Sequence, residues 1–133
     1  MEDTYKIEIV TPEKIIFSDD KVLEVILPSY EGEMGILKDH ISIISFLRPG
    51  IIKILKSSKN LNSFFVHDGI IEFYNNNLTI LSTKIINIKN LNKEIINQLV
   101  IETEKILKDE KINDDNRYLA NHRLEALKSL NLN

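Results

Sequence analysis

The first two thirds of the chain alternate apolar and polar residues over short stretches that turn residues separate. Tyr5, Ile7 and Ile9 alternate with Lys6 and Glu8, which is the two-residue period of a half-buried β-strand. Further strand-like runs follow, each bounded by Pro, Gly, Asn, Asp or Ser: 15–17, 22–27, 41–46, 51–55, 63–67, 70–74 and 78–81. Repeated short strands between turns are typical of an antiparallel sandwich or barrel.

Two turn sequences predict how the later strands connect. Asp68-Gly69 separates 63–67 from 70–74 and is a signal for a tight hairpin. The three asparagines at 75–77 have the same role before the next run. Prolines fall only at the ends of predicted strands, where a missing N–H is tolerated.

After Asn90 the apolar spacing changes to that of a helix. Asn90 or Asn92 can serve as the N-cap. The apolar stripe of this predicted helix contains Leu91, Ile95, Ile96, Leu99, Thr103, Ile106 and Leu107. The pattern breaks at 108–113, and Asp114 and Asp115 then suit the start of a second helix, where carboxylates meet the positive end of the dipole.

The second helix has its own apolar stripe, formed by Leu119, Ala126 and Leu130 with Ala120 and Leu127 beside it. A hairpin of about 40 residues has little core of its own, so it must pack on the sandwich or on another protein. The predicted fold is mainly β plus α. An N-terminal antiparallel β-sandwich domain of short strands (1–88) precedes a C-terminal domain (89–133) that is an antiparallel two-helix hairpin.

Composition narrows the function classes. A length of 133 residues suits one domain with a small appendage, and a hydrophobic fraction of 43% supports a packed core. The net charge of −3 argues against a nucleic-acid partner. The absence of cysteine excludes thiolate chemistry and disulfides. No apolar run approaches the roughly 20 residues of a spanning helix and no signal peptide is evident, so we expect a protein without direct membrane insertion.

Enzyme chemistry finds no support in the spacing of reactive residues. His40, His67 and His122 fall in different predicted elements, which argues against a metal site. Asp39 and His40 are adjacent, and adjacent strand residues point to opposite faces. The glycines match neither phosphate-binding fingerprint. We therefore expect no enzyme activity, no catalytic residue, no metal, no nucleotide site and no cofactor.

The stretch Gly32-Glu33-Met34-Gly35-Ile36-Leu37, followed by His40, uses two of only four glycines in the chain. A structural interpretation makes Gly32 and Gly35 the shapers of a sharp corner between strands. That interpretation leaves Tyr30, Glu31 and Met34 unexplained, and such residues in a loop suit a binding surface.

The second predicted helix carries Arg117, Arg123 and Lys128 after its acidic start. Arg123 falls within the apolar stripe. Either its alkyl stem packs there with the guanidinium at the rim, or the helix presents the arginine to an acidic partner when the hairpin moves.

These features together resemble one family, the epsilon subunit of bacterial and chloroplast ATP synthases, which is called delta in mitochondria. The resemblance covers nearly the whole chain. Its anchors are Val10-Thr11-Pro12-Glu13, the stretch Glu31-Gly32-Glu33-Met34-Gly35-Ile36-Leu37, His40, Leu47-Arg48-Pro49-Gly50, and Phe64-Phe65-Val66 with Gly69.

The resemblance implies a non-catalytic central-stalk subunit at the cytoplasmic face of a bacterial membrane, with the gamma subunit, the c-ring and the alpha and beta subunits as partners. It would couple rotation of gamma and the c-ring to ATP synthesis. The residues that match the family's c-ring contact are Tyr30, Glu31, Gly32 and Glu33, and those that match the gamma contact are Met34 and His40.

In many bacterial members of the family the hairpin extends along gamma and inhibits ATP hydrolysis. There, basic residues of the second helix meet acidic residues of the beta subunit. The resemblance therefore makes Arg117, Arg123 and Lys128 candidates for an inhibitory contact.

Two positions depart from the family's pattern. Some members bind ATP through Ile/Leu-Asp-x-x-Arg-Ala, and the matching stretch here, Leu91-Asn92-Lys93-Glu94-Ile95-Ile96, lacks the acid and the arginine. We therefore expect no ATP binding. Asp68 replaces the glycine that usually precedes Gly69, and Asp-Gly should keep the hairpin.

Two alternatives from other classes remain open at this point. One is a stand-alone ligand-binding β-sandwich, against which the absence of tryptophan counts. The other is a small hydrolase that uses Glu31, Glu33 and His40.

Overall fold

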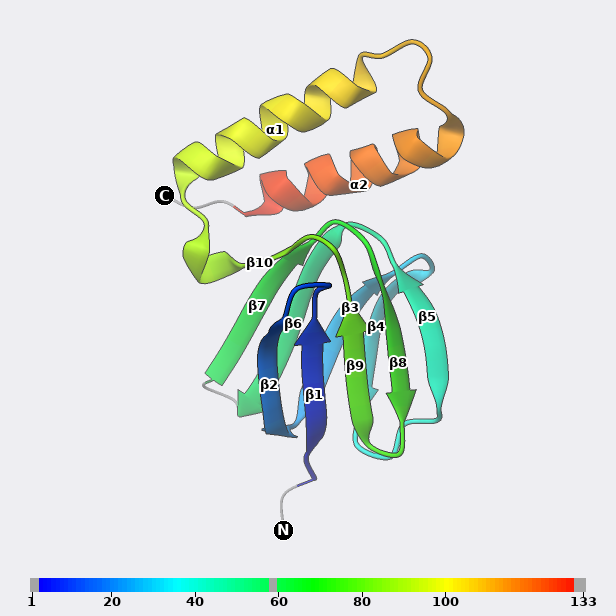
Figure 1. Cartoon of the computed structure of the whole chain (residues 1–133), viewed down its shortest axis with the longest axis vertical. Helices are drawn as coiled ribbons and strands as arrows, with labels where there is room; N and C mark the ends of the chain where they lie inside the picture. Colours follow the sequence, from blue (N-terminus) through cyan, green and yellow to red (C-terminus); the bar gives the residue numbers. More distant parts are fainter. Residues whose placement is uncertain (1–2, 58–59, 131–133) are drawn as a thin grey trace.

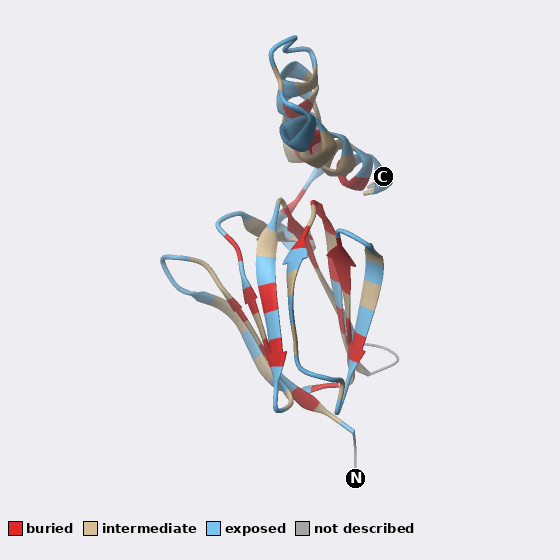
Figure 2. Cartoon of the chain, turned by 90° about the vertical axis from the view of Figure 1, so that its right-hand side faces the viewer, coloured by how far each residue is buried: buried red, intermediate tan, exposed pale blue. Residues whose placement is uncertain are grey.

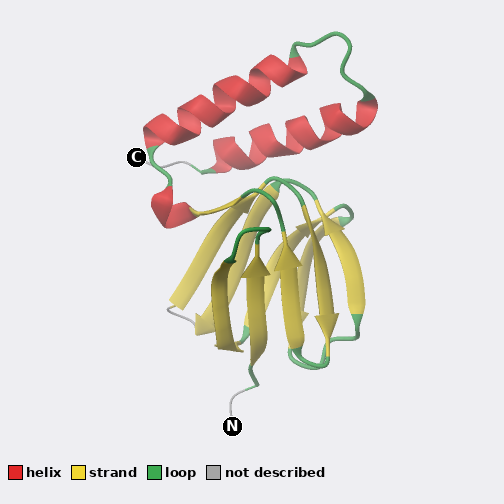
Figure 3. Ribbon diagram, viewed as in Figure 1, coloured by secondary structure: helices red, strands yellow, loops and turns green. Residues whose placement is uncertain are grey.

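The computed structural model describes residues 3–57 and 60–130, in which strands precede helices (Figure 3). The strands are β1 (Tyr5–Val10), β2 (Ile15–Val22), β3 (Glu24–Ser29), β4 (Gly32–Leu37), β5 (Ile43–Leu47), β6 (Gly50–Ser57), β7 (Asn60–Val66), β8 (Gly69–Tyr74), β9 (Asn77–Leu81) and β10 (Ile85–Asn87). A short 3-10 turn, η1 (Ile88–Asn90), leads into the helices α1 (Lys93–Leu107) and α2 (Asp114–Ser129).

The strands form two layers that face each other across the core (Figures 1 and 2). One layer contains β10, β7, β6 and β3, with β4 paired to β3, and the other contains β5, β8, β9, β1 and β2. A single residue pair, Ser29 with Leu47, joins the layers through β3 and β5. The predicted sandwich followed by a two-helix hairpin is therefore confirmed.

The pairing is mixed, and in this respect the prediction of a purely antiparallel sandwich is wrong. β1 runs parallel to β9, with Ile7 opposite Leu78. These two strands are far apart in the sequence, so no tight hairpin forces them to run in opposite directions.

The two predicted hairpin turns have different outcomes. The turn between β8 and β9 is confirmed: Asn75 and Asn76 have φ angles of 49° and 58°, which is the left-handed backbone that a two-residue hairpin requires. The Asp68-Gly69 hairpin is wrong, because β7 pairs with β6 and β10 whereas β8 pairs with β5 and β9. At this point the chain crosses from one layer to the other.

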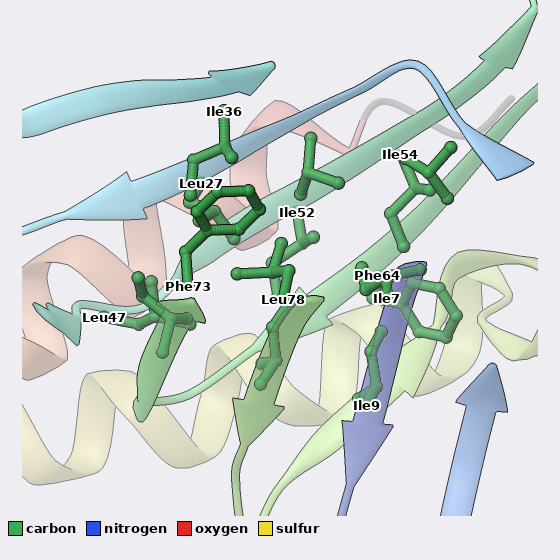
Figure 4. Packing of buried hydrophobic residues seen from close by; sticks show 14 of the residues in the cluster. Ile7, Ile9, Leu27, Ile36, Leu47, Ile52, Ile54, Phe64, Phe73 and Leu78 are labelled. Atoms are coloured by element: carbon green, nitrogen blue, oxygen red, sulfur yellow. The ribbon is translucent and has the colours of Figure 1, made fainter. Parts of the chain in front are cut away.

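The core between the layers consists mainly of aliphatic side chains from alternate strand positions (Figure 4). Ile7 and Ile9 of β1 are fully buried, as the alternating pattern predicts. The Tyr5 hydroxyl, which is buried, donates a hydrogen bond to the carbonyl oxygen of Ile36 on β4 and so joins the two layers. Burial, the largest cause, raises the pKa of this hydroxyl.

The glycine-containing stretch forms a strand, β4, which pairs with β3 along its whole length. Gly32, with a φ of 121°, shapes the turn that begins this strand, as the structural interpretation of the sequence expects. Gly35 does not shape a turn, because it lies inside β4 opposite Ile26. A Cβ at this position would come within 3.0 Å of the Glu24 carboxylate.

Side-chain caps define the start of both helices. The Asn92 carboxamide oxygen accepts a hydrogen bond from the Ile95 N–H at 2.8 Å, which confirms one of the two predicted caps of α1. Asn113 caps α2 in the same way through the Asn116 N–H at 2.7 Å. Asp114 and Asp115 occupy the first turn of α2, as the dipole argument expects.

The hairpin packs against one end of the sandwich, with α2 closer to the strands than α1 (Figure 1). A second apolar cluster, separate from the core between the layers, joins the helices to the sheet. Its buried members are Phe65, Leu91, Ile96, Ala126 and Leu127. Ile51 of β6 and Ile86 of β10 pack at its edge. The expectation that the hairpin leans on another body is met by the sandwich itself.

Candidate interaction surfaces

The turn between β3 and β4 contains the residues expected to contact the c-ring. Glu31 and Glu33 are exposed, and Gly32 allows the chain to reverse between them. The Tyr30 ring is 48% exposed and stacks on Tyr118 of α2, with 5.5 Å between ring centroids. The turn therefore lies at the hairpin end of the sandwich and contacts α2 directly.

Met34 and His40, the two residues expected to contact gamma, lie in different surroundings. Met34 is half-buried and packs against the main core, because its strand position faces inward with Leu27. His40 follows the other end of β4, where its Nδ1 lies 2.8 Å from the Ile41 carbonyl oxygen and its ring meets Phe73 edge-on. Asp39 and Asn76 hydrogen-bond each other at this end of the sandwich.

The proposed hydrolase residues do not come together. Glu31 and Glu33 lie at the start of β4, and His40 lies beyond its end. Six residues of strand span about 17–20 Å at the usual rise, which is far beyond hydrogen-bond reach. These three side chains therefore form no catalytic group.

An apolar surface that the sequence did not reveal covers the outer face of β5, β8 and β9. Phe46, Ile70 and Leu81 form one cross-strand row, with exposures of 62%, 41% and 47%. Ile44 and Tyr74 extend this row along the same layer. We call these five residues the outer apolar face. Such patches on a folded protein mark sites of association.

The three basic residues of α2 are not equivalent. Arg117 and Lys128 are exposed. Arg123 is half-buried, and its Nε donates to the Thr103 hydroxyl oxygen of α1 at 2.9 Å. Its Nη1 lies 3.4 Å from Nδ1 of His67, the residue that follows β7. The sequence interpretation of a packed arginine therefore describes this docked state.

His67 has an unusual electrostatic setting. Burial first, and then the charges of Arg123 and Lys84, lower the pKa of its imidazole to about 4. The ring is therefore neutral at pH 7, and in the tautomer with its proton on Nε2 the Nδ1 atom can accept the Arg123 hydrogen bond. In the described part of the chain, Nε2 is buried without a hydrogen-bond partner. Burial likewise lowers the pKa of Arg123.

Sequence reasoning missed His67 and Tyr118 as contacts between the hairpin and the sandwich, and Thr103 as the contact of Arg123 within the hairpin. Thr103 carried a signal, because it is the only polar member of an otherwise aliphatic helical stripe and it is fully buried. His67 carried a weaker one, as a histidine at the end of an apolar strand. Tyr118 lies off the apolar stripe, so periodicity could not identify it.

An open cavity of about 810 Å³ lies beside Arg123, between the hairpin and the sandwich. Lys84, Lys105 and Lys111 line it together with Asp68 and Asp109. Within residues 3–57 and 60–130, no group of three or more His, Asp or Glu side chains could hold a metal ion. In the same described part of the chain, no helix is long and apolar enough to cross a membrane.

Comparison with known proteins gives one consistent result. Residues 4–88 match the family described as the ATP synthase delta/epsilon chain, beta-sandwich domain. The chain is 52% identical to the ATP synthase epsilon chain of Pelagibacter ubique over 131 residues, which covers 98% of this chain and 100% of the relative. It is 32% identical to the ATP synthase epsilon chain of Parvibaculum lavamentivorans, covering 98% of this chain and 97% of the relative.

Solved structures with the same fold include a chain of the Euglena gracilis mitochondrial ATP synthase in an OSCP/F1/c-ring assembly. It has a TM-score of 0.78 at 16% identity, over 97% of this chain and 82% of that one. A chain of the central stalk and c-ring of the Tetrahymena thermophila mitochondrial ATP synthase has a TM-score of 0.65 at 16% identity, over 96% of each chain. These likenesses extend across both the sandwich and the helices.

Proposed function

The chain belongs to the ATP synthase delta/epsilon family, and we propose that it is the non-catalytic epsilon subunit in the central stalk of a proton-translocating ATP synthase. The observation that carries this proposal is the full-length likeness to a bacterial ATP synthase epsilon chain. Relatives that are subunits of a complex argue against a stand-alone ligand-binding sandwich.

The proposed role is to couple rotation of gamma and the c-ring to ATP synthesis by the alpha and beta subunits. We expect the subunit to lie peripherally at the cytoplasmic face of the bacterial membrane. A coupling subunit needs two separate contacts, one with the c-ring and one with gamma. The exposed turn at Tyr30 to Glu33 and the outer apolar face are two separate surfaces that could serve these contacts.

We propose Tyr30, Glu31, Gly32 and Glu33 as the c-ring contact, because they form a protruding turn with exposed carboxylates. For gamma we propose His40 and the outer apolar face, since exposed apolar side chains grouped on neighbouring strands favour a protein partner. Met34 of β4 supports this contact indirectly, because its side chain packs against the main core.

The hairpin has the proposed role of an inhibitor of ATP hydrolysis, with Arg117, Arg123 and Lys128 contacting acidic residues of the beta subunit. Arg117 and Lys128 are exposed in the docked state, whereas Arg123 is engaged between the helices and the sandwich. A beta-subunit contact that includes Arg123 would therefore require the hairpin to leave its docking site.

Two experiments test the function. Affinity purification of the tagged chain from native membranes should recover ATPase activity together with the other subunits, and recovery of the chain alone would refute membership of the complex. An ATPase assay of the assembled complex with and without residues 90–133 tests the inhibitory role. The truncated complex should hydrolyse ATP faster, and equal rates would refute inhibition.

Nucleotide binding is not part of the proposal. Asn92 stands where ATP-binding members of the family have an acid, and its carboxamide caps α1 instead. Isothermal titration of the isolated chain should give no heat of ATP binding at submillimolar concentration. A clear binding isotherm would contradict this expectation.

A further inference from the structure

Arg123 is the one basic residue of α2 that holds the hairpin and the sandwich together within the described residues. Its Nε donates to Oγ1 of Thr103 on α1 at 2.9 Å, and its Nη1 lies 3.4 Å from Nδ1 of His67. One guanidinium therefore contacts the other helix and the sandwich at the same time. The planar fork of arginine suits such a double contact, and lysine could not reproduce it.

The histidine acceptor also contacts its own sandwich domain. The His67 backbone N–H donates to the Lys84 carbonyl oxygen at 3.1 Å, and its ring meets Phe65 edge-on at 5.1 Å. The next carbonyl, that of Asp68, accepts a hydrogen bond from the Ser82 hydroxyl at 2.6 Å. These contacts all come from the sandwich and position the His67 ring independently of Arg123.

The threonine acceptor is fixed by its own helix. The Thr103 hydroxyl donates to the Leu99 carbonyl oxygen at 2.7 Å, so its proton is committed and its lone pairs face Arg123. Thr103 is fully buried. Loss of Arg123 from this position would therefore leave a buried oxygen with one hydrogen bond fewer.

We propose that Arg123 and His67 form a latch that holds the hairpin on the sandwich, with Thr103 holding the guanidinium in place from within the hairpin, and that this latch withholds Arg123 from an acidic partner. The second half of this proposal rests on the proposed inhibitory function. Arg117 and Lys128 lie outside the latch and are exposed in the docked state. The latch therefore makes one of the three candidate inhibitory cations, Arg123, available only after undocking.

Docking can be measured on the isolated full-length chain through a single introduced thiol. The chain has no cysteine, and Ala126 is buried under the docked hairpin, so Ala126→Cys reacts with a thiol reagent only when the hairpin opens. The labelling rate then reports the undocked fraction.

Matched variants separate the latch from packing. His67→Leu and Thr103→Val remove the acceptors and keep the volume, whereas His67→Asn and Thr103→Ser keep an acceptor oxygen. We expect His67→Leu to raise the labelling rate about tenfold, as for loss of one hydrogen bond to a charged group, and Thr103→Val to raise it less, because its hydrogen bond to Arg123 lies within the hairpin. The second pair should stay within about twofold of the parent. Circular dichroism checks that each variant retains the fold.

Two outcomes would overturn the latch. One is an unchanged labelling rate in His67→Leu. The other is an equal rise in His67→Leu and His67→Asn, because the hydrogen bond would then not be the cause.

The assembled ATP synthase tests the second half. His67→Leu should lower ATP hydrolysis severalfold in the complete complex and leave it unchanged in a complex that lacks residues 90–133. If the thiol labels faster but hydrolysis is unchanged, the latch stands and the proposed inhibitory function fails. The two failures are thereby distinguishable.

Discussion

At the scale of single residues, the Arg123 contact of His67 depends on the charge state of its imidazole. Nδ1 can accept from Arg123 only while the imidazole is neutral. Protonation of the imidazole would place a second cation beside Arg123. Lys84 adds a further positive charge nearby, and Asp68, which follows His67 in the sequence, is the neighbouring negative charge. The docked state therefore favours the unprotonated ring.

This preference predicts a pH dependence with a definite sign. The pKa of His67 is lowered to about 4 from its ordinary value of 6.5, so the unfolded chain binds the proton first as the pH falls. The stabilising contribution of His67 is complete above about pH 6.5 and is lost between that value and about pH 4.

Urea unfolding of the wild type and of His67→Asn across this range is the measurement. The titration of all other carboxyl and imidazole groups is common to both proteins and cancels in the difference. The difference in unfolding free energy should shift against the wild type as the pH falls from 6.5 to 4. A difference that does not vary with pH would contradict the assignment.

Gly69 provides a second prediction at this scale. A Cβ at this position would lie 2.6 Å from the Leu81 carbonyl oxygen, and backbone cannot move aside as a side chain can. Gly69→Ala should therefore lower the free energy of unfolding by about 2 kcal/mol. In Gly35→Ala the new methyl group meets only the flexible Glu24 side chain, so we expect a change within about 0.5 kcal/mol. Equal losses in denaturant titrations would show that the close approach is not decisive.

At the scale of elements, the sequence identified strands and helices better than it identified their partners. The period of two in β1 and the change of period after Asn90 follow from the burial of one face, which is a local property. The turn at Asn75-Asn76 was also predictable, because left-handed backbone is itself a local requirement.

Asp68-Gly69 shows where local reasoning ends. Its residue types suit a hairpin, yet the flanking strands β7 and β8 pair with other strands. Gly69 instead allows its backbone to lie close to the Leu81 carbonyl oxygen of β9. The partners of β7 and β8 depend on how the whole sheet closes on itself. The same limit applies to the β1–β9 pairing and to the outer apolar face.

The caps of the helices give a prediction at the element scale. The Asn92 carboxamide satisfies an N–H that would otherwise lack a partner within α1. Asn92→Ala should cost about 1 kcal/mol of unfolding free energy, whereas Asn92→Asp should retain most of the stability because aspartate also caps well. Thermal unfolding followed by circular dichroism measures both, and an alanine variant as stable as the wild type would contradict the role of the cap.

At the scale of the whole molecule, one chain combines a sandwich with a helical hairpin that packs on one end of it. The sandwich has a core formed by its own two layers, and the hairpin adds a second cluster around Phe65 and Leu127. The apolar stripes on the helices predicted that they would be covered, but the same stripes could face another protein. The polar contacts of Arg123 distinguish the docked state, and they join residues far apart in the sequence.

The outer apolar face yields the last prediction. Phe46 and Ile70 are cross-strand neighbours on β5 and β8, and they are 62% and 41% exposed. Much of their apolar surface therefore faces solvent and could be buried by a partner. Phe46→Asp with Ile70→Asp should weaken binding to gamma by tenfold or more, since burial of each such side chain contributes about 1.5–3 kcal/mol. Because both side chains already face solvent, the variant should keep its thermal stability within a few degrees.

Leu61→Asp is the matched control, because Leu61 is 54% exposed on β7 of the other layer and lies outside this face. Co-purification of a tagged variant chain with gamma measures the effect, and circular dichroism of the isolated chain checks the fold. If the double variant retained gamma as well as Leu61→Asp does, the outer apolar face would not be the contact. The gamma contact would then have to lie on another surface, with the end of β4 around His40 as the next region to test.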